Sequence, residues 1–314
     1  MAVAMVPVWT VAIKKVKKEV TKTKMPQLGI FAALSFLMMM FNVPLPGGTT
    51  GHAVGGTLIA ILMGPNAACI SVSVALMVQA LLFGDGGILS FGANCFNMAF
   101  VLPFVGYYIY KFIKERTASK GGEYAAIILG SYFGIVVASL CAAVEFGIQP
   151  LLFKDAGGQP LYCPYGLGVS IPAMVIPHMA VAGPVEVLFT LLITLFVKKV
   201  SPDMIEDTPQ KKTKSIWGLL LVLICATPLG LLASGTAWGE WGSDEIAGLA
   251  GYTPKGMSNG LDYGALLPDY SVSGMPEVLG YLVSAVLGVA ILIIVFKLIG
   301  GTKKDDVTSP ARTK

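Results

Sequence analysis

The feature that most constrains this chain is a series of long apolar runs that recurs along most of its length. Several runs reach the roughly 17 to 25 residues that a helix needs to cross the hydrocarbon core of a bilayer, and they are too many for one signal peptide or anchor. Only 13% of the residues are charged, whereas soluble domains carry about a quarter. Because the sequence lacks the short alternating segments of a membrane barrel, we expect an all-α, polytopic transmembrane helical bundle.

The apolar runs predict nine helices in two parts. We expect them over residues 1–13, 27–43, 53–63, 67–83, 94–113, 124–146, 171–197, 216–233 and 278–298. Seven helices belong to a membrane core over residues 1–200, a polar linker covers 201–214, and two helices form an accessory region over 215–314. The first helix is short, because its residues at 1.5 Å each span about 20 Å, against roughly 30 Å of hydrocarbon.

Glycine and proline interrupt or shape several of these runs. The sequence PLPGG over 44–48 can neither continue a helix nor form the interior of a strand, and GDGG over 84–87 breaks the chain again. Small residues at four-residue spacing over 130–138 predict a close contact between helices. Three prolines in the first half of 171–197 predict a kinked or re-entrant segment there.

Basic residues predict the orientation. All 22 lysines and arginines except Lys154 and Lys255 lie in four clusters, which follow the first helix, surround 111–120, occupy the linker and end the chain. Cytoplasmic loops carry the excess of positive charge. All four clusters can be cytoplasmic if 53–63 counts as a crossing. The chain then lies in a prokaryotic plasma (inner) membrane with its N-terminus outside the cell and its C-terminus in the cytoplasm. The acidic loop 234–277 then lies outside, where it either collects cations or is simply solvated.

His52 is the first candidate ligand. It is one of two histidines in the chain and stands in the motif PGGTTGHAVGG over 46–56. A histidine near a membrane interface is more often a hydrogen-bonded structural group. The surrounding glycines, however, leave it little steric cover and permit a loop folded tightly round an ion. Neutral imidazole is a common ligand for Ni, Co, Cu and Zn.

Asp85 and Asn94 are candidates for supporting such a site. Asp85 in GDGG either bonds its own turn or orients a histidine from the second shell of ligands. Asn94 stands where a helix is expected to begin, so it either caps that helix or takes part in the site. With the predicted orientation, both residues and His52 face the same compartment outside the cell.

His178 and Glu186 are ionisable residues inside an apolar run, where such groups are costly and usually face the bundle interior or a partner. Their spacing places them on one helical face if the helix is continuous. A buried pair and a contact with another subunit are both compatible with the pattern. The five cysteines form no CxxC pair and mostly fall in apolar runs, which indicates packing rather than metal ligation.

The sequence contains no Walker A loop, HExxH, GxSxG or Rossmann fingerprint. We therefore expect no enzymatic activity, no ATPase site and no bound cofactor in this chain, and no binding of nucleic acid. Energy for any transport must come from ion gradients or from partners.

The strings PGGTTGHAVGG, FGDGG and FGANCFNMA resemble the CbiM/NikM family, the cobalt and nickel S components of energy-coupling factor (ECF) transporters. The likeness covers the core to about residue 200, and the tail resembles the two-helix CbiN/NikN component of the PDGLE type. The resemblance implies a seven-helix core that binds Co(II) or Ni(II) at the outer face, in a cell-membrane transport system that can serve cobalamin biosynthesis. It implies a CbiQ/NikQ-like T subunit and two CbiO/NikO-like ATPase subunits as partners.

The family holds its ion through the N-terminal amine, the amide and imidazole of a second-position histidine, and the histidine that matches His52. This chain starts with Met1-Ala2-Val3, so Met1 offers an amine only if it is the true N-terminus, and the second-position histidine is missing. We expect a start placed too late or a truncation, and weak metal binding by the chain as given. Isothermal titration of Ni(II) into this chain and into one restored upstream tests that expectation.

Two other functions remain open at this point. A secondary transporter would use His178 and Glu186 as a proton relay and would work without ATPase subunits. A non-transporting assembly subunit would use its glycine loops only for packing, and His52→Ala would then leave metal uptake unchanged.

Overall fold

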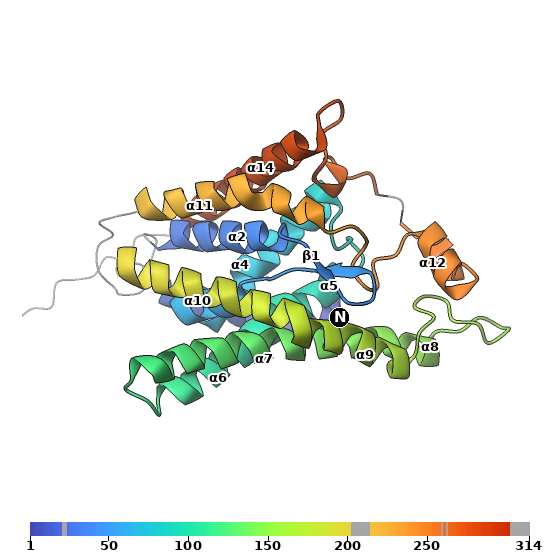
Figure 1. The fold of residues 1–314 in the computed structure, drawn as a ribbon, viewed down its shortest axis with the longest axis horizontal. Coiled ribbons are helices and arrows are strands. Elements are labelled where there is room, and N and C mark those ends of the chain that lie inside the picture. The colour runs from blue at the N-terminus through green and yellow to red at the C-terminus, as the bar shows by residue number, and fades with distance from the viewer. Residues whose placement is uncertain (21–23, 202–213, 259, 262, 302–314) are drawn as a thin grey trace, which may run out of the picture.

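The computed structural model describes residues 1–20, 24–201, 214–258, 260–261 and 263–301. Almost all of the regular structure is helical (Figure 1). The α-helices are α1 (Ala2–Glu19), α2 (Met25–Met39), α3 (Gly56–Met63), α4 (Pro65–Val78), α5 (Phe91–Asn94), α6 (Leu102–Lys114), α7 (Lys120–Gly147), α8 (Gln149–Leu152), α9 (Leu167–Pro177), α10 (Gly183–Val200), α11 (Lys214–Ala226), α12 (Ser243–Ala250), α13 (Lys255–Ser258) and α14 (Glu277–Gly301).

Several α-helices continue directly into turns of another helical type. The π-helical turns are η1 (Gln79–Phe83), η2 (Cys95–Val101) and η3 (His178–Ala182), and the 3₁₀ turns are η5 (Thr227–Leu232) and η6 (Pro268–Tyr270). Six helical stretches among the described residues are long and apolar enough to cross a membrane, namely Pro65–Phe83, Phe91–Lys114, Lys120–Leu152, Leu167–Val200, Lys214–Leu232 and Glu277–Gly301. The expected all-α, multi-pass membrane protein is confirmed.

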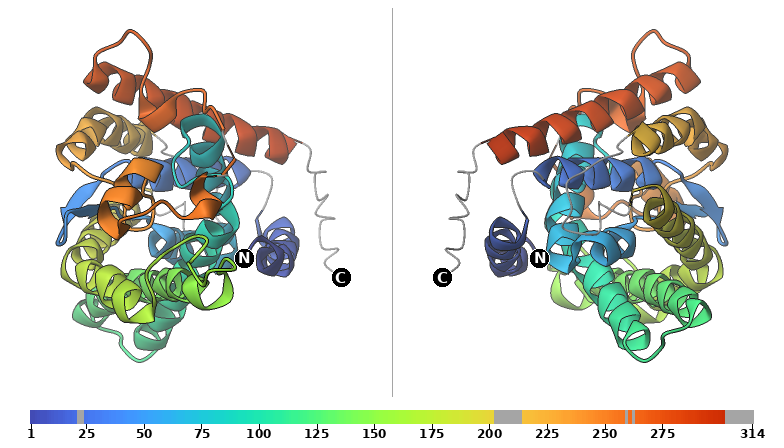
Figure 2. Two further views of the ribbon diagram at one scale, coloured as in Figure 1. Left: turned by 90° about the vertical axis from the view of Figure 1, so that its right-hand side faces the viewer. Right: turned by 90° about the vertical axis from the view of Figure 1, so that its left-hand side faces the viewer.

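The first helix is longer than expected. Instead of ending at Ile13, α1 continues through the lysines to Glu19. Lysine is a good helix former, and positive charge near a helix C-terminus is favourable. Figure 2 shows α1, in dark blue, at the edge of the bundle, where it packs against α4, and the Trp9 indole donates a hydrogen bond to Ser73 Oγ over 2.9 Å.

The PLPGG stretch forms part of a small hairpin, which corrects the expectation that it excludes a strand. Helix α2 ends at Met39, and β1 (Val43–Leu45) pairs antiparallel with β2 (Thr49–Gly51). Pro44 is tolerated because a short two-stranded hairpin has edges where its missing N–H is not needed. The helix expected at 53–63 begins only at Gly56, because the preceding residues form the loop that carries His52.

Residues 167–200 form one helical segment with a π turn in the middle, rather than a re-entrant element. The π turn η3 follows Pro177 and precedes Pro184, where two prolines disturb the regular hydrogen-bond ladder. Such π turns occur preferentially at functional positions. This turn begins with His178.

The predicted close contact of small residues is confirmed at the crossing of α6 and α7. A Cβ added at Gly130 would lie 2.7 Å from the Gly106 carbonyl oxygen, and one at Gly134 would lie 2.9 Å from the Leu102 carbonyl oxygen. Only glycine permits backbones to approach this closely.

The C-terminal region lies against the core through α14, which packs along α2 (Figure 1). The ring of Phe36 occupies the space where a Cβ at Gly288 would stand, 2.2 Å away. Tyr281 on α14 donates a hydrogen bond to the Met40 carbonyl oxygen over 2.9 Å. The predicted linker 201–214 falls almost entirely on residues outside the described part of the chain.

The bundle has two distinct ends. Figure 1 shows the hairpin strand β1, α5 and α12 towards the right, and the connection between α6 and α7 at the left. At that left end Lys114 and Lys198 both form ion pairs with Glu123, which brings the basic ends of α6 and α10 to the start of α7. The hairpin that leads into His52 therefore lies at the opposite end from these basic residues.

Candidate metal site

His52 follows β2 directly, in a loop that ends at the start of α3. The loop closes at Gly55, whose φ of +73° is a left-handed conformation that glycine adopts readily. The imidazole is partly buried, and its Nδ1 atom lies 3.2 Å from the Ala53 carbonyl oxygen. A hydrogen bond there places the proton on Nδ1 and leaves Nε2 as the nitrogen available to a ligand.

His52 lines a cavity of about 150 Å³ between the core helices and the C-terminal region. Asn94 and Asn97 reach the same cavity from α5 and η2, and His178 reaches it from η3. The C-terminal region contributes Trp238 and the exposed Glu240. Both histidines of the chain thus border one cavity although they are 126 residues apart in sequence.

The surroundings of His52 favour the neutral imidazole that metal binding requires. Burial lowers the pKa of His52 below its ordinary value, and the nearby Asp85 carboxylate raises it to a lesser extent. The same carboxylate makes the cavity more favourable for a cation. Among the described residues, no three His, Cys, Asp or Glu side chains are close enough together to hold a metal ion, so His52 provides an imidazole without a ready-made cluster of such ligands.

Asp85 acts on His52 only through its charge, because its hydrogen bonds go elsewhere. Gln79 Nε2 donates to the Asp85 carboxylate over 2.9 Å, and the Tyr270 hydroxyl also donates to it. Gln79 Nε2 in turn lies 2.7 Å from the Tyr270 hydroxyl oxygen. The sequence suggested that Asp85 could orient a histidine. In the structure the Asp85 carboxylate is instead held by the Tyr270 hydroxyl of the C-terminal region and by Gln79.

The Asn94 side chain does not cap a helix, which corrects one of the two roles considered for it: Asn94 directly precedes η2 but makes no capping bond there. It is the last residue of α5, and Ser90 stands at the N-cap position. Its Nδ2 atom donates to the Gly86 carbonyl oxygen over 3.0 Å and thereby fixes the GDGG turn. Asn94 also lines the His52 cavity, so it links the turn to that cavity.

Met1 lies near this region but borders a different cavity. That space, of about 920 Å³, is lined by Met1, Asn94 and Asn97 among others. Gly92 makes room for the start of α1, since a Cβ there would lie 2.4 Å from the Ala2 nitrogen. The structure therefore brings Met1 close to the asparagines but does not place it on the wall of the His52 cavity.

His178 and Glu186 do not form the pair that their spacing allows. His178 Nδ1 lies 2.7 Å from the Met174 carbonyl oxygen within its own helix. The Glu186 carboxylate is fully buried and accepts hydrogen bonds from the backbone N–H groups of Val54, at 2.7 Å, and Gly55, at 3.0 Å. Glu186 therefore contacts the His52 loop, while His178 lines the cavity.

Sequence reasoning missed the polar pair formed by Asn97 and Glu145. Asn97 Nδ2 donates to Glu145 Oε2 over 3.0 Å, and one oxygen atom of each side chain is buried without a hydrogen-bond partner. Glu145 lies in the apolar run 124–146, so the rule that singled out Glu186 would also have found it. Asn97 borders both cavities.

The C-terminal region contacts the His52 loop directly, which the sequence did not reveal. Its residue Thr236 accepts hydrogen bonds through its carbonyl oxygen from the Thr50 N–H, at 3.3 Å, and the Thr49 hydroxyl, at 2.9 Å. Thr50 and Ala237 form an isolated parallel β-bridge. The cavity wall therefore contains residues from both parts of the chain.

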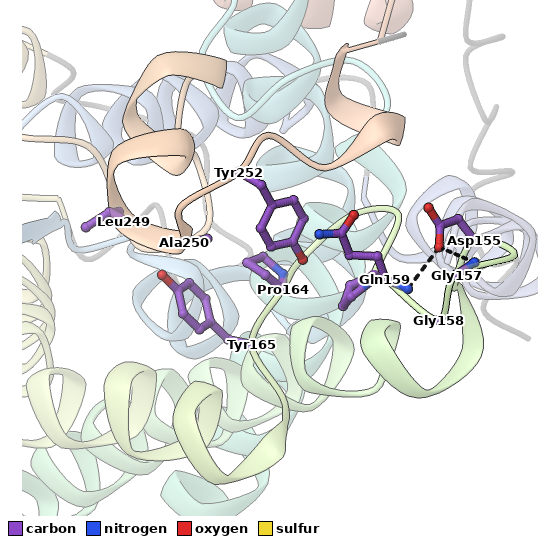
Figure 3. Close-up of a pocket in the computed structure, with 10 residues that line it drawn as sticks. Asp155, Gly157, Gly158, Gln159, Pro164, Tyr165, Leu249, Ala250 and Tyr252 are labelled. Atoms are coloured by element: carbon purple, nitrogen blue, oxygen red, sulfur yellow. Dashed lines mark hydrogen bonds between the residues drawn. The ribbon is translucent and has the colours of Figure 1, made fainter.

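A further contact between the two parts lies away from His52. It borders a cavity of about 680 Å³ between the loop after α8 and the end of α12. Tyr165 lines this cavity from the loop after α8, and Tyr252 lines it from the segment after α12 (Figure 3). Asp155 accepts backbone hydrogen bonds from Gly157 and Gln159 and pairs with Lys255 at 2.7 Å. The ion pair and these hydrogen bonds hold the pKa of Asp155 below its usual value.

The model of a family described as "Cobalt uptake substrate-specific transmembrane region" matches residues 1–204, and that of the PDGLE domain matches residues 212–304. A "Probable fused nickel transport protein LarMN" of Lactiplantibacillus plantarum is 50% identical over 98% of this chain and 94% of its own length. A "Fused nickel transport protein NikMN" of Rhodobacter capsulatus is 41% identical over 92% of this chain and 90% of its own length.

A solved structure described as a transition metal transporter is also similar. It is 54% identical in sequence, has a TM-score of 0.60, and the match covers 64% of this chain and 87% of that one. A truncated transition metal transporter gives the same TM-score at 53% identity, over 63% of this chain.

Proposed function

Because the chain belongs to the CbiM family of cobalt-uptake transmembrane regions and carries a PDGLE domain behind it, we propose that it is the substrate-binding S component of an ATP-driven importer for Ni(II) or Co(II). The chain is a multi-pass membrane protein of a metal-transport family. Two similar fused proteins are named as nickel transport proteins, which favours nickel as the substrate. His52 binds the ion at the extracytoplasmic face before it is carried inward.

The observation that carries the proposal is the position of His52. Its imidazole lines a cavity with two asparagines and the second histidine, at the end of the bundle opposite the paired lysines of α6 and α10. If those lysines are cytoplasmic, as the excess of positive charge on that side predicts, the cavity opens outside. A C-terminal fluorescent-protein fusion tests this orientation, because it fluoresces only when the C-terminus is cytoplasmic.

Transport by this chain depends on partners. A transmembrane T subunit and two cytoplasmic ATPase subunits supply the energy, because the sequence carries no nucleotide-binding motif of its own. The proton-relay mechanism lacks its central contact, since the Glu186 carboxylate bonds the loop backbone and His178 bonds Met174.

Uptake of radioactive nickel into cells tests the proposal. Cells that contain this chain, the T subunit and both ATPase subunits should accumulate the metal, and an ATPase subunit with a disabled Walker lysine should abolish accumulation. His52→Ala should reduce uptake to background while the protein remains in the membrane fraction. Uptake without ATPase subunits that collapses with an uncoupler would support a secondary transporter instead. Uptake that is unchanged in His52→Ala would remove His52 from the site.

A further inference from the structure

Glu186 is a fully buried carboxylate that does not line the cavity of the candidate metal site. It lies in the membrane-spanning stretch Leu167–Val200, and its side chain has no exposed surface. A buried carboxylate is very costly unless its oxygen atoms are well bonded. In the described part of the chain Glu186 forms no ion pair. Two backbone N–H groups of the loop that carries His52 donate to its carboxylate, and the Thr190 hydroxyl of the same helix lies near it.

These two N–H groups directly precede α3, which has no side-chain cap of its own. Gly55 occupies the N-cap position and Val54 precedes it. The first N–H groups of a helix lack partners within the helix, and negative charge is favourable at that end. Glu186 Oε2 accepts from Val54 at 2.7 Å, and both carboxylate oxygens accept from Gly55, at 3.0 and 3.1 Å. A carboxylate from α10 thus stands at the start of α3 and bonds the two N–H groups just before its first turn.

The same loop is held from its other side by α2. Ser35 Oγ donates to the Val54 carbonyl oxygen over 2.7 Å, and both residues are buried. The peptide groups on either side of Val54 are therefore fixed by two different helices. His52 precedes Val54 by two residues, and its Nδ1 atom lies within hydrogen-bond distance of the Ala53 carbonyl oxygen in the same short segment.

We propose that Glu186 is a positioning residue for the metal site, which sets the direction of the His52 imidazole by holding the backbone at Val54 and Gly55. The proposal rests on the proposed function, since it takes His52 as a metal ligand. Glu186 does not line the His52 cavity, so it acts through the loop and does not touch the ion. The ligand it serves is a divalent ion that accepts imidazole nitrogen, such as Ni(II) or Co(II).

A carboxylate is required because both of its oxygen atoms accept. In Glu186→Gln the side chain keeps its shape, but its NH₂ group replaces one acceptor and faces the donors of the loop. The substitution therefore loosens the loop without leaving a large void. Residues that orient metal ligands in this way change metal affinity by about 10- to 100-fold when they are replaced.

The experiment uses the full purified chain in nanodiscs and titrates it with Ni(II) and Co(II). We expect Glu186→Gln to weaken Ni(II) binding by about 10- to 100-fold and to alter the absorption bands of bound Co(II), which report ligand geometry. Ser35→Ala removes the bond on the other side of Val54 and should weaken binding in the same direction. Ser35→Ala keeps the test decisive if Glu186→Gln does not fold.

Thr194→Val provides the matched control. Thr194 is on the same helix and is fully buried, and its hydroxyl has no hydrogen-bond partner among the residues that the structure describes. This variant should bind both metals with unchanged affinity and unchanged Co(II) bands. Equal binding by Glu186→Gln, Ser35→Ala and the unmodified chain would overturn the proposal.

The double variant separates positioning from a direct role. If Glu186 acts only through His52, His52→Ala combined with Glu186→Gln should bind no more weakly than His52→Ala alone. A further loss in the double variant would show that Glu186 contributes independently, and would also overturn the proposal. A chain whose metal binding does not depend on His52 would contradict the proposed function itself, whereas dependence on His52 without dependence on Glu186 would contradict only the positioning role.

Discussion

Tyr270 in the C-terminal region donates its hydroxyl hydrogen to the carboxylate of Asp85 in the core. The two residues are 185 positions apart, and Gln79 donates to both of them. Tyr270 is buried, with a φ of +60° that is unusual for an aromatic residue. Because Asp85 also influences His52 electrostatically, this contact connects the docking of the C-terminal region to the candidate metal site. Backbone strain of this kind is often found at functional positions.

Tyr270→Phe removes that hydroxyl and leaves the ring in place. We expect the free energy of unfolding to fall by about 1.5–3 kcal/mol, the range for a hydrogen bond to a charged group. We also expect a change in Ni(II) affinity, because Asp85 loses the Tyr270 bond and is held by Gln79 with less restraint. Chemical denaturation and calorimetric titration measure the two effects. Tyr281→Phe is the control, since among the described residues the Tyr281 hydroxyl donates to the Met40 carbonyl oxygen and not to Asp85. An unchanged affinity in Tyr270→Phe would disconnect the C-terminal contact from the site.

Asp85→Asn keeps the shape of the side chain and removes its charge. The carboxylate attracts positive charge in the His52 cavity, so we expect Ni(II) to bind several-fold more weakly, with a smaller dependence on salt concentration. Titration at low and high ionic strength measures both. Asp155→Asn removes a carboxylate that pairs with Lys255 outside this cavity, and it should leave Ni(II) affinity unchanged. Equal effects of the two substitutions would mean that the charge of Asp85 has no local role.

Glu240 brings a carboxylate from the C-terminal region to the His52 cavity, and the residue as a whole is exposed. Burial of its carboxyl group and the nearby Asp85 carboxylate raise the pKa of Glu240 to about 7, so its charge is fully present only above that pH. An exposed charge beside a binding cavity changes association rates more than final affinity. We therefore expect Glu240→Gln to slow Ni(II) association several-fold at low salt and to have little effect at high salt, as measured by stopped-flow fluorescence of the nearby tryptophans. Glu245→Gln is the control, because Glu245 is bonded by the Thr236 hydroxyl and does not line the cavity.

Hydropathy and glycine motifs predicted a large part of this molecule. Long apolar runs identify membrane helices because hydrocarbon thickness sets their length, and the glycines around His52 indicated a tight loop. The contacts of Glu186 and Asp85 could not be predicted in this way. Their partners, Gly55 and Tyr270, lie 131 and 185 residues away, and no local pattern encodes such a distance. Which residues pair with buried carboxylates depends on how the helices pack.

Local sequence propensity also predicted the wrong structure at positions where contacts between distant segments determine it. Asn94 has the side chain of an N-cap, yet the chain already turns into a helix at Phe91, and Asn94 bonds the Gly86 carbonyl oxygen instead. Pro44 argued against a strand, yet β1 forms because its partner β2 is only four residues further on. The His178–Glu186 spacing indicated a pair, but each side chain bonds a backbone group instead, Met174 within the same helix for His178 and the distant Val54 for Glu186.

The crossing of α3 and α6 provides a test of how packing supports the His52 loop. Gly106 on α6 lies against Thr57 in the first turn of α3, and a Cβ at Gly106 would be 2.1 Å from Thr57 Oγ1 and 3.0 Å from the Gly130 carbonyl oxygen. Gly106→Ala therefore has to push α3 away, and overpacking of this kind costs about 1–3 kcal/mol. We expect both a lower free energy of unfolding and weaker Ni(II) binding, because the displaced turn follows the residues that hold His52.

Gly121→Ala serves as the comparison for this variant. Gly121 is in the first turn of α7, and a Cβ there would meet no atom within 4 Å. Alanine is the better helix former by up to about 1 kcal/mol, so Gly121→Ala should be neutral or slightly stabilising and should bind Ni(II) normally. Chemical denaturation and Ni(II) titration of the two variants side by side measure both the free energy of unfolding and the affinity. If Gly106→Ala loses stability but keeps full Ni(II) affinity, the loop is held by Glu186 and Ser35 alone. A shift of α3 then has no effect on the position of the His52 imidazole.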